Sequence, residues 1–249
     1  MIDLHSHILP AIDDGAIDME MALDMARLAV DDGVEVMACT PHLLPGVYEP
    51  KPQDVIARVA ELNERLMDEG IDLVVVSGCE AHVRPDMAAR VKSGDVLSIH
   101  GGKYVLVEAP PTTLPPHLDR MFLDIIAAGY TPILAHVERY RWAERAMPWV
   151  QNMVLSGVLM QVTAGSFFGD YGHSARELAM RLLDTGAVHL VASDAHDNVR
   201  RPPGLRKAWN LVHTELGESE ARIIFRDRPE IILLGETVAA PQKARAEVL

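Results

Sequence analysis

Histidine and acidic residues near the start of the chain are spaced as metal ligands could be. His5 and His7 are one residue apart, and Asp14 follows seven positions after His7. Imidazole nitrogens and carboxylate oxygens bind zinc, manganese, iron and cobalt in proteins. A His-x-His pair is by itself more often a surface or core feature than a metal site. The prediction of a site therefore depends on whether other parts of the chain supply further ligands.

Further candidate ligands stand directly after or at the end of short apolar runs. They are His42 in CTPH, Glu80 in SGCE, Glu108 in VLVEA, His136 in ILAHVERY, and Asp194 with His196 in VASDAH. Each has an ordinary explanation when taken singly, since Asp194 could cap a helix and Glu108 could be a paired core acid. Together with His5, His7 and Asp14, these make nine such residues at the ends of six predicted strands. A protein with a purely structural role would not be expected to place them so. We interpret them as the ligands of one metal centre.

An alternation of strands and helices would bring these residues together. Strands are predicted at 2–4, 34–39, 72–77, 104–108, 132–135, 159–163 and 189–193. Helices are predicted near 18–32, 52–69, 84–91, 116–128, 141–156 and 174–185, with two or three more after residue 201. Several helices end at a glycine directly before a strand, as parallel βαβ units require. The pattern fits an open doubly wound sheet or a closed barrel of seven strands, with the functional face at the strand C-termini.

Composition favours one α/β domain over residues 1–249, with a loose tail from about residue 237. The formal net charge of −13 disfavours binding to nucleic acid or to a membrane surface. No apolar run is long enough to span a bilayer, and the N-terminus lacks the features of a secretory signal. Cys39 and Cys79 lie in apolar runs rather than in a disulfide framework. These observations predict a cytoplasmic protein, and its oligomeric state is not apparent from the sequence.

Local charge predicts an anionic substrate. Nine ligands suffice for three divalent ions, and three such ions with four carboxylates give the filled site a charge of roughly +2. Arg139 lies three residues after His136, and Arg201 five residues after His196. Arginine binds phosphate oxygens through a planar pair of donors. Both are candidates for phosphate binding, although Arg200 competes with Arg201 for the role.

Other residues have weaker interpretations. His82 and His173 are the histidines to consider if a ligand or proton donor is missing, and Asp13 is expected to shape its turn. A cysteine phosphatase is excluded because its Cys-x5-Arg motif is absent: Cys39 is followed at that position by Pro45, and Cys79 by Pro85.

The motifs HSH, DDG, TPH, GCE, VE, HVERY and SDAH, in this order, resemble those of the PHP (polymerase and histidinol phosphatase) superfamily. More narrowly, MIDLHSHI, HVERY, SDAHDNVRRPP and QVTAGSFFGDYG resemble the manganese-dependent protein-tyrosine phosphatases of bacterial capsule and exopolysaccharide loci. The resemblance extends from Met1 to about Leu234. Leu43 and Ala109 depart from the family pattern and could alter the shape of the pocket.

This resemblance implies a distorted (β/α)7 barrel holding three divalent ions, manganese first, with iron, zinc or cobalt as alternatives. It implies one ion at His5, His7, Glu80 and Asp194, a second at Glu80, Glu108 and His136, and a third at Asp14, His42 and His196. Glu80 would bridge the first two ions, and Arg139 and Arg201 would bind phosphate. The implied substrate is a phosphotyrosine protein, namely the tyrosine-rich tail of a capsule tyrosine kinase.

The expected reaction is hydrolysis of a phosphomonoester by a metal-activated water. His42 and Asp14 are near enough to be guessed as the general acid. The closest alternative is a histidinol phosphatase or another small-molecule phosphoesterase of the superfamily. A nuclease accessory domain is disfavoured by the acidic surface. A non-catalytic metal-binding regulator of a kinase is disfavoured because all nine ligands are present.

Overall fold

All paired strands of the fold run parallel to their neighbours. The computed structural model describes residues 1–238. One sheet has the order β1-β2-β4 and the other the order β3-β5-β6-β7-β8-β9. The strands are β1 (Ile2–Ser6), β2 (Val36–Cys39), β3 (His42–Leu43), β4 (Val74–Ser77), β5 (Glu80–His82), β6 (Tyr104–Glu108), β7 (Thr131–Leu134), β8 (Leu159–Thr163) and β9 (Leu190–Ala192).

The two sheets join into one closed barrel. Only residues 40–41 separate β2 from β3, and only residues 78–79 separate β4 from β5, so each pair continues one strand across a short break. Cys39 pairs with Ser77 before these breaks, and His42 pairs with Glu80 after them. At the remaining edge, the Asp194 N–H donates to the His5 carbonyl at 2.9 Å, which joins β9 to β1. Seven strand paths therefore close on themselves, which confirms the distorted barrel and excludes the open sheet.

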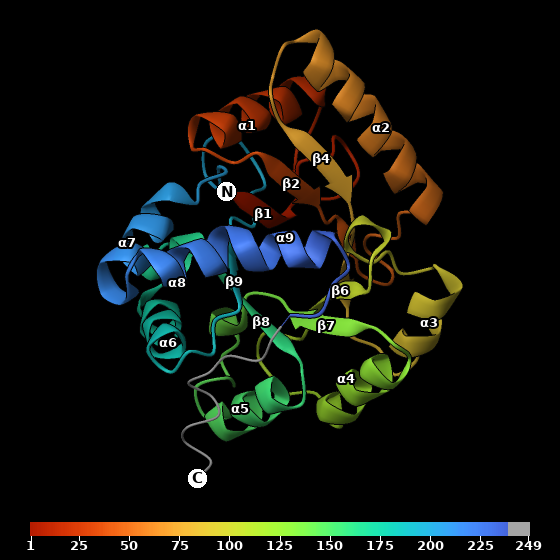
Figure 1. Ribbon diagram of the computed structural model, residues 1–249. Helices are drawn as coiled ribbons and strands as arrows, with labels where there is room; N and C mark the ends of the chain where they lie inside the picture. The colour runs from red at the N-terminus through yellow and green to blue at the C-terminus, as the bar shows by residue number, and fades with distance from the viewer. Residues whose placement is uncertain (239–249) are drawn as a thin grey trace.

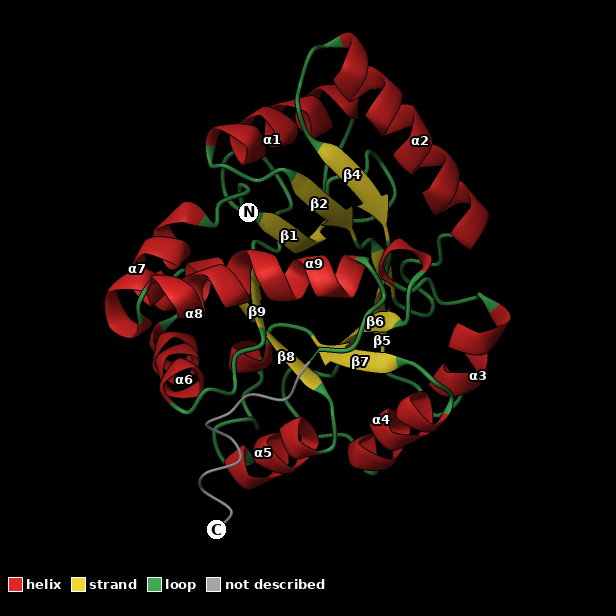
Figure 2. Ribbon diagram, in the orientation of Figure 1, coloured by secondary structure: helices red, strands yellow, loops and turns green. Residues whose placement is uncertain are grey.

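Helices surround the barrel, as Figures 1 and 2 show. They are α1 (Met19–Asp31), α2 (Pro52–Asp68), α3 (Met87–Ser93), α4 (Leu118–Ala127), α5 (Met147–Leu155), α6 (His173–Asp184) and α7 (Arg206–Leu216). The Asp18 side chain caps α1 by accepting from the Met21 N–H at 2.9 Å, and Pro52 begins α2 where its missing N–H costs nothing. The helix predicted from 141 begins only at Met147, after a series of turns.

The barrel interior is an aliphatic core closed at one end by a helix. Ile2, Leu4 and Leu106 belong to a buried cluster that also contains Ile232 of α9 (Arg228–Leu233). Helix α9 continues from α8 (Glu218–Arg222) through a π-helical turn at Ile223–Asp227, and Figure 1 shows it crossing the barrel. Because Ile2 begins its strand, this helix covers the N-terminal ends of the strands. The C-terminal ends of the strands are not covered by this helix, and the predicted ligands lie there.

Two further observations bear on the sequence predictions. Among residues 1–238, no helix combines the length and hydropathy needed to span a bilayer. The predicted loose tail falls outside the described residues except for its first two, which form hydrogen bonds: Lys103 Nζ donates to Thr237 Oγ1 at 2.9 Å, and the Val238 N–H donates to Tyr104 Oη at 3.1 Å.

Candidate metal centre

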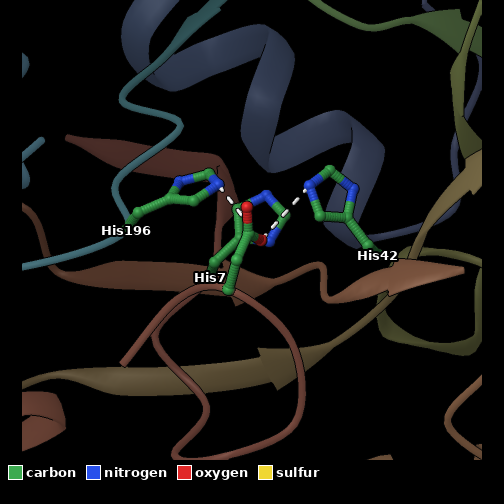
Figure 3. A group of neighbouring side chains, drawn as sticks. His7, His42 and His196 are labelled. Atoms are coloured by element: carbon green, nitrogen blue, oxygen red, sulfur yellow. Dashed lines mark ion pairs between the residues drawn. The ribbon is translucent and has the colours of Figure 1, made fainter. Parts of the chain in front are cut away.

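The nine predicted ligands converge at the C-terminal end of the barrel. Side-chain donors gather in three overlapping groups, each close enough to hold one cation: His7, Asp14, His42 and His196; His5, His7 and Glu80; and His42, Glu80 and Glu108. Figure 3 shows the rings of His7, His42 and His196 facing a common space from three different elements. The predicted convergence of these residues is therefore found in the structure.

The group around His5 has the spacing of ligands on one ion. His5 Nε2 lies 3.4 Å from Glu80 Oε2, 3.3 Å from Asp194 Oδ1 and 3.3 Å from His7 Nε2. His7 Nε2 lies 3.6 Å from the same oxygen of Glu80 and 3.4 Å from that of Asp194. Ligand atoms held at the usual bond length around a tetrahedral ion are about 3.4 Å apart. These four side chains are already arranged as such a set.

Glu80 faces two groups with its two oxygens. Its Oε2 points to the imidazoles of His5 and His7, while its Oε1 lies 2.7 Å from His136 Nε2. His136 Nε2 is in turn 3.7 Å from Glu108 Oε1. A carboxylate with one oxygen toward each of two donor sets is placed as a bridging ligand would be.

The third group differs in part from the arrangement that the resemblance implies. His42 Nε2 and His196 Nε2 lie 3.4 Å and 3.7 Å from Asp14 Oδ1, as expected. His42 Nδ1, however, also lies 2.9 Å from Glu80 Oε2, and His7 joins the Asp14 group. His42 and His7 thus each face two groups.

The electrostatics of the centre favour bound cations. Glu80 Oε2 is buried and has no hydrogen-bond partner, although three imidazoles face it. Burial raises the pKa of Glu80, but His5 and His136 lower it further, so the pKa lies well below its usual range. Burial lowers the pKa of His7, yet Asp13, Asp194 and Glu80 raise it to about 10. The negative field thus favours positive charge at His5 and His7, and the donor chemistry of the cluster fits divalent metal ions.

Two of the predicted ligands adopt unusual backbone conformations. His136 has φ of 31° and Asp194 has φ of 53°, the left-handed region that residues other than glycine rarely adopt. His136 lies two residues after the end of β7, and Asp194 lies two residues after the end of β9. Such strain persists where surrounding structure enforces it, and it concentrates at functional sites.

Asp13 and Gln161 contact the predicted ligands, and the sequence analysis identified neither set of contacts. Asp13 Oδ2 lies 2.7 Å from His7 Nδ1 and accepts from the His42 N–H at 2.9 Å. Its Oδ1 accepts from the Gly15 N–H at 3.0 Å, so Asp13 shapes the turn, as predicted, and also contacts two of the predicted ligands. Gln161 Oε1 lies 3.0 Å from His5 Nδ1 and accepts from the His136 N–H. The signal for Gln161 was a polar residue inside the apolar run LMQVT.

Both predicted arginines contact the carboxylate of Asp194 and lie near the ring of Tyr171. Arg139 donates to Asp194 Oδ2, and Arg201 Nη2 donates to the same oxygen at 2.6 Å. The guanidinium carbons of Arg139 and Arg201 lie 4.4 Å and 5.7 Å from the ring centre of Tyr171, whose hydroxyl accepts from Arg201 Nε at 3.2 Å. Arg200 is exposed and lies outside this arrangement. Tyr171 is a further residue that the sequence analysis did not single out.

The predicted family agrees with comparisons to known proteins. Residues 1–234 match the family model described as "Capsular polysaccharide synthesis, CpsB/CapC". The chain belongs to this family. That assignment confirms the resemblance inferred from the motifs of the sequence.

Relatives within the CpsB/CapC family cover nearly the whole chain. The tyrosine-protein phosphatase YwqE of Bacillus subtilis (strain 168) is 34% identical over 238 residues, which are 96% of this chain and 93% of that protein. The tyrosine-protein phosphatase CpsB of Streptococcus pneumoniae is 26% identical over 243 residues, covering 96% and 100%. A solved structure from a study of YwqE and CpsB, described as metal-dependent tyrosine phosphatases, superposes with a TM-score of 0.92 at 34% identity, covering 97% of this chain and 98% of that one.

The other two histidines singled out in the sequence, His82 and His173, lie at the edge of the histidine and carboxylate cluster and on the cavity beside it. His82 Nδ1 is 3.7 Å from Glu108 Oε2, at the edge of the centre. His173 has a side chain 79% exposed and pairs with Glu177 within α6 at 3.1 Å. A cavity of about 620 Å³ adjoins the metal centre and is lined by Glu108, His136, Arg139 and Tyr171, among others.

Proposed function

We propose that this chain is a metal-dependent protein-tyrosine phosphatase that acts in capsular polysaccharide synthesis. The observation that carries the proposal is the placement of Arg139 and Arg201 on Asp194, at the edge of a histidine and carboxylate cluster. Two guanidiniums beside cation-binding donors form a pocket for a phosphoryl group. Membership in a family with curated tyrosine-protein phosphatases supplies the leaving group, a tyrosyl oxygen.

The proposed cofactors are three divalent metal ions, with manganese as the first choice. The proposed ligand sets are His5, His7, Glu80 and Asp194; Glu80, Glu108 and His136; and Asp14, His42 and His196. Bound divalent ions would lower the pKa of water toward neutrality and polarise the phosphoryl oxygens. The structural support is the spacing of the donor atoms and the orphaned oxygen of Glu80.

The protein's own residues bind and orient the phosphate. Asp194 and Tyr171 hold the guanidiniums of Arg139 and Arg201 on one side of the cluster, where they can neutralise equatorial phosphoryl oxygens as charge develops. The 620 Å³ cavity adjoins Arg139 and offers room for the aryl ring. Because a tyrosyl oxygen has a pKa of about 10, it leaves with less proton donation than an alkoxide needs.

The proposed physiological substrate is the tyrosine-rich tail of a capsule tyrosine kinase. The support is the family's place in capsular polysaccharide synthesis together with a phosphotyrosine-directed relative. Incubation of the purified enzyme with an autophosphorylated kinase of this class, followed by phosphotyrosine immunoblotting, tests this assignment.

The decisive experiment compares substrates and metals on the demetallated enzyme. A phosphotyrosine peptide and histidinol phosphate are supplied in turn with manganese, iron, zinc or cobalt. We expect manganese to restore hydrolysis of the peptide, and we expect H136A and D194N to abolish it. H213A is the matched control, since that histidine is exposed on α7 and does not line the 620 Å³ cavity, and it should retain full activity.

Each alternative has a distinct outcome. Faster turnover of histidinol phosphate than of the peptide would assign the chain to small-molecule phosphatases. Bound metal without hydrolysis of either substrate would indicate a non-catalytic regulator. Full activity in metal-free buffer would contradict the metal-dependent mechanism.

A further inference from the structure

A second cavity, of about 410 Å³, adjoins the proposed phosphate site. Tyr171 and Arg201 line it, and Tyr171 lines the first cavity as well. Its remaining cationic lining residues are Arg200 and Lys207, from the loop after β9 and from the first turn of α7. A chain with a net charge of −13 thus gathers three cationic side chains around one cavity beside its active site.

Arg200 and Lys207 are available to a ligand. Both are exposed, and neither side chain forms an ion pair within residues 1–238. Of the two acids that line the cavity, Asp32 is already engaged, because its Oδ2 accepts from the N–H groups of Leu205 and Arg206 at 2.5 Å and 2.8 Å. The Asp170 carboxylate lies beside Gly165.

The loop after β9 is built to present two arginines in different directions. Asp197 Oδ1 accepts from the backbone N–H groups of Val199, Arg200 and Arg201, which fixes this loop as a turn. Within it, Arg201 reaches Asp194 at the metal centre, whereas Arg200 stays exposed at the second cavity. In the sequence, the two adjacent arginines are alternative candidates for phosphate binding. In the structure they occupy separate positions.

We propose that this second cavity is a specificity subsite that binds an acidic side chain next to the phosphotyrosine of the substrate. The proposal rests on the proposed function, because it assumes a phosphotyrosine peptide in the neighbouring cavity. Arg200 and Lys207 bind the carboxylate, and the Tyr171 ring separates it from the phosphoryl group.

The lining favours a peptide carboxylate over a free or doubly charged anion. Phe168, which is 46% exposed, and Pro202 line the same cavity and offer apolar contacts to a peptide. Asp32 and Asp170 also lie there, and they would repel a phosphate dianion more strongly than a single carboxylate. An acidic residue of a peptide carries a single negative charge, and its neighbours in the chain can make the apolar contacts.

The test uses pairs of phosphotyrosine peptides that differ only in glutamate against glutamine, placed in turn at each flanking position. For the metal-loaded wild-type enzyme, we expect one position at which glutamate raises kcat/KM roughly fivefold through KM alone, as a half-exposed ion pair would. In R200A/K207A this glutamate-to-glutamine ratio should fall to about one. The ratio is taken within each variant, so a partial loss of folded enzyme cancels.

K92A/R120A is the matched control, because these exposed cations of α3 and α4 line neither cavity, and it should keep the wild-type ratio.

A ratio of one at every position in the wild type, with the peptides still hydrolysed, overturns the subsite and leaves the proposed function standing. Failure to hydrolyse any peptide or a small aryl phosphate overturns the proposed function instead. A second phosphotyrosine that lowers KM more than glutamate does overturns the carboxylate assignment.

Discussion

Asp13 contacts two of the proposed metal ligands, His7 and His42, without being one of them. Its carboxylate fixes which nitrogen of His7 faces the other ligands, because Oδ2 lies at Nδ1 and leaves Nε2 directed inward. We expect D13N to keep the fold and to weaken metal binding by roughly 10- to 100-fold, as loss of such carboxylate partners does. Titration of manganese into the demetallated variant measures the effect.

The same substitution at Asp18 is the control for D13N. Asp18 caps α1, and asparagine caps a helix equally well, so D18N should bind metal as the wild type does. If D13N also binds metal normally, Asp13 only shapes its turn, as the sequence alone indicated.

Tyr171 is expected to act as a positioning residue for the two arginines. Y171F keeps the ring under Arg139 and Arg201 and loses only the hydroxyl that accepts from Arg201 Nε, so kcat/KM should fall no more than a few-fold. Y171A removes the ring as well and should cost roughly tenfold or more. Inhibition by inorganic phosphate should weaken in parallel while manganese affinity stays unchanged. Equal losses in both variants would show that the ring does not position the arginines.

At the scale of elements, the loop between β1 and α1 packs its own backbone tightly against the backbone of His7. Gly15 lies so close to His7 that a Cβ atom at this position would come within 2.0 Å of the His7 carbonyl oxygen. The Ala16 N–H donates to that same oxygen at 3.0 Å, so the loop folds back onto the strand end that carries the ligand. This loop therefore sets the position of His7, Asp13 and Asp14 together.

G15A should displace this loop and weaken both stability and metal binding. We expect a loss of about 1–3 kcal/mol in the free energy of unfolding of the demetallated protein, as overpacking produces. G204A is the matched control, since a Cβ at Gly204 meets nothing within 4 Å and should cost little. Urea unfolding of both variants decides the point, and equal stabilities would show that the loop can move away without cost.

At the scale of the whole molecule, a buried histidine links stability to acid pH. His189, at the start of the β9 region, is buried, and Nδ1 accepts from the Met160 N–H at 3.0 Å. Burial and the neighbouring Arg228 lower its pKa to about 3, whereas the unfolded chain binds this proton near pH 6.5. Because the unfolded state is then the more protonated one, His189 should reduce stability as the pH falls from about 6.5 toward 3.

The comparison of wild type with H189Q isolates this contribution. Glutamine can still accept from the Met160 N–H but does not titrate. The free energy of unfolding of the wild type should fall relative to that of H189Q by about 1.4 kcal/mol per pH unit in this window. Parallel stability curves for the two proteins would contradict the assignment, and other titrating groups, the metal ligands included, cancel in the difference.

Much of this organisation was predictable because it is periodic. Apolar runs, helix periods and terminal glycines identified the seven strand paths and most helices, and parallel strands always direct their C-terminal ends to one face. The convergence of His5, Glu80 and Asp194 followed from that rule alone. The continuation of two strand paths beyond a break, as β3 and β5, was not predicted, because those short segments pair with strands distant in sequence.

The sequence by itself determined which residues could bind metal and which fold class could gather them, since donor chemistry and periodicity are local properties. Only the tertiary structure decided between an open sheet and a closed barrel, because closure depends on the contact of β9 with β1, nearly two hundred residues apart. It likewise separated Arg201 from Arg200 and gave Asp13, Gln161 and Tyr171 their roles. A residue that acts by holding another side chain carries no signal in its own neighbourhood of sequence, because its partner is brought to it only by folding.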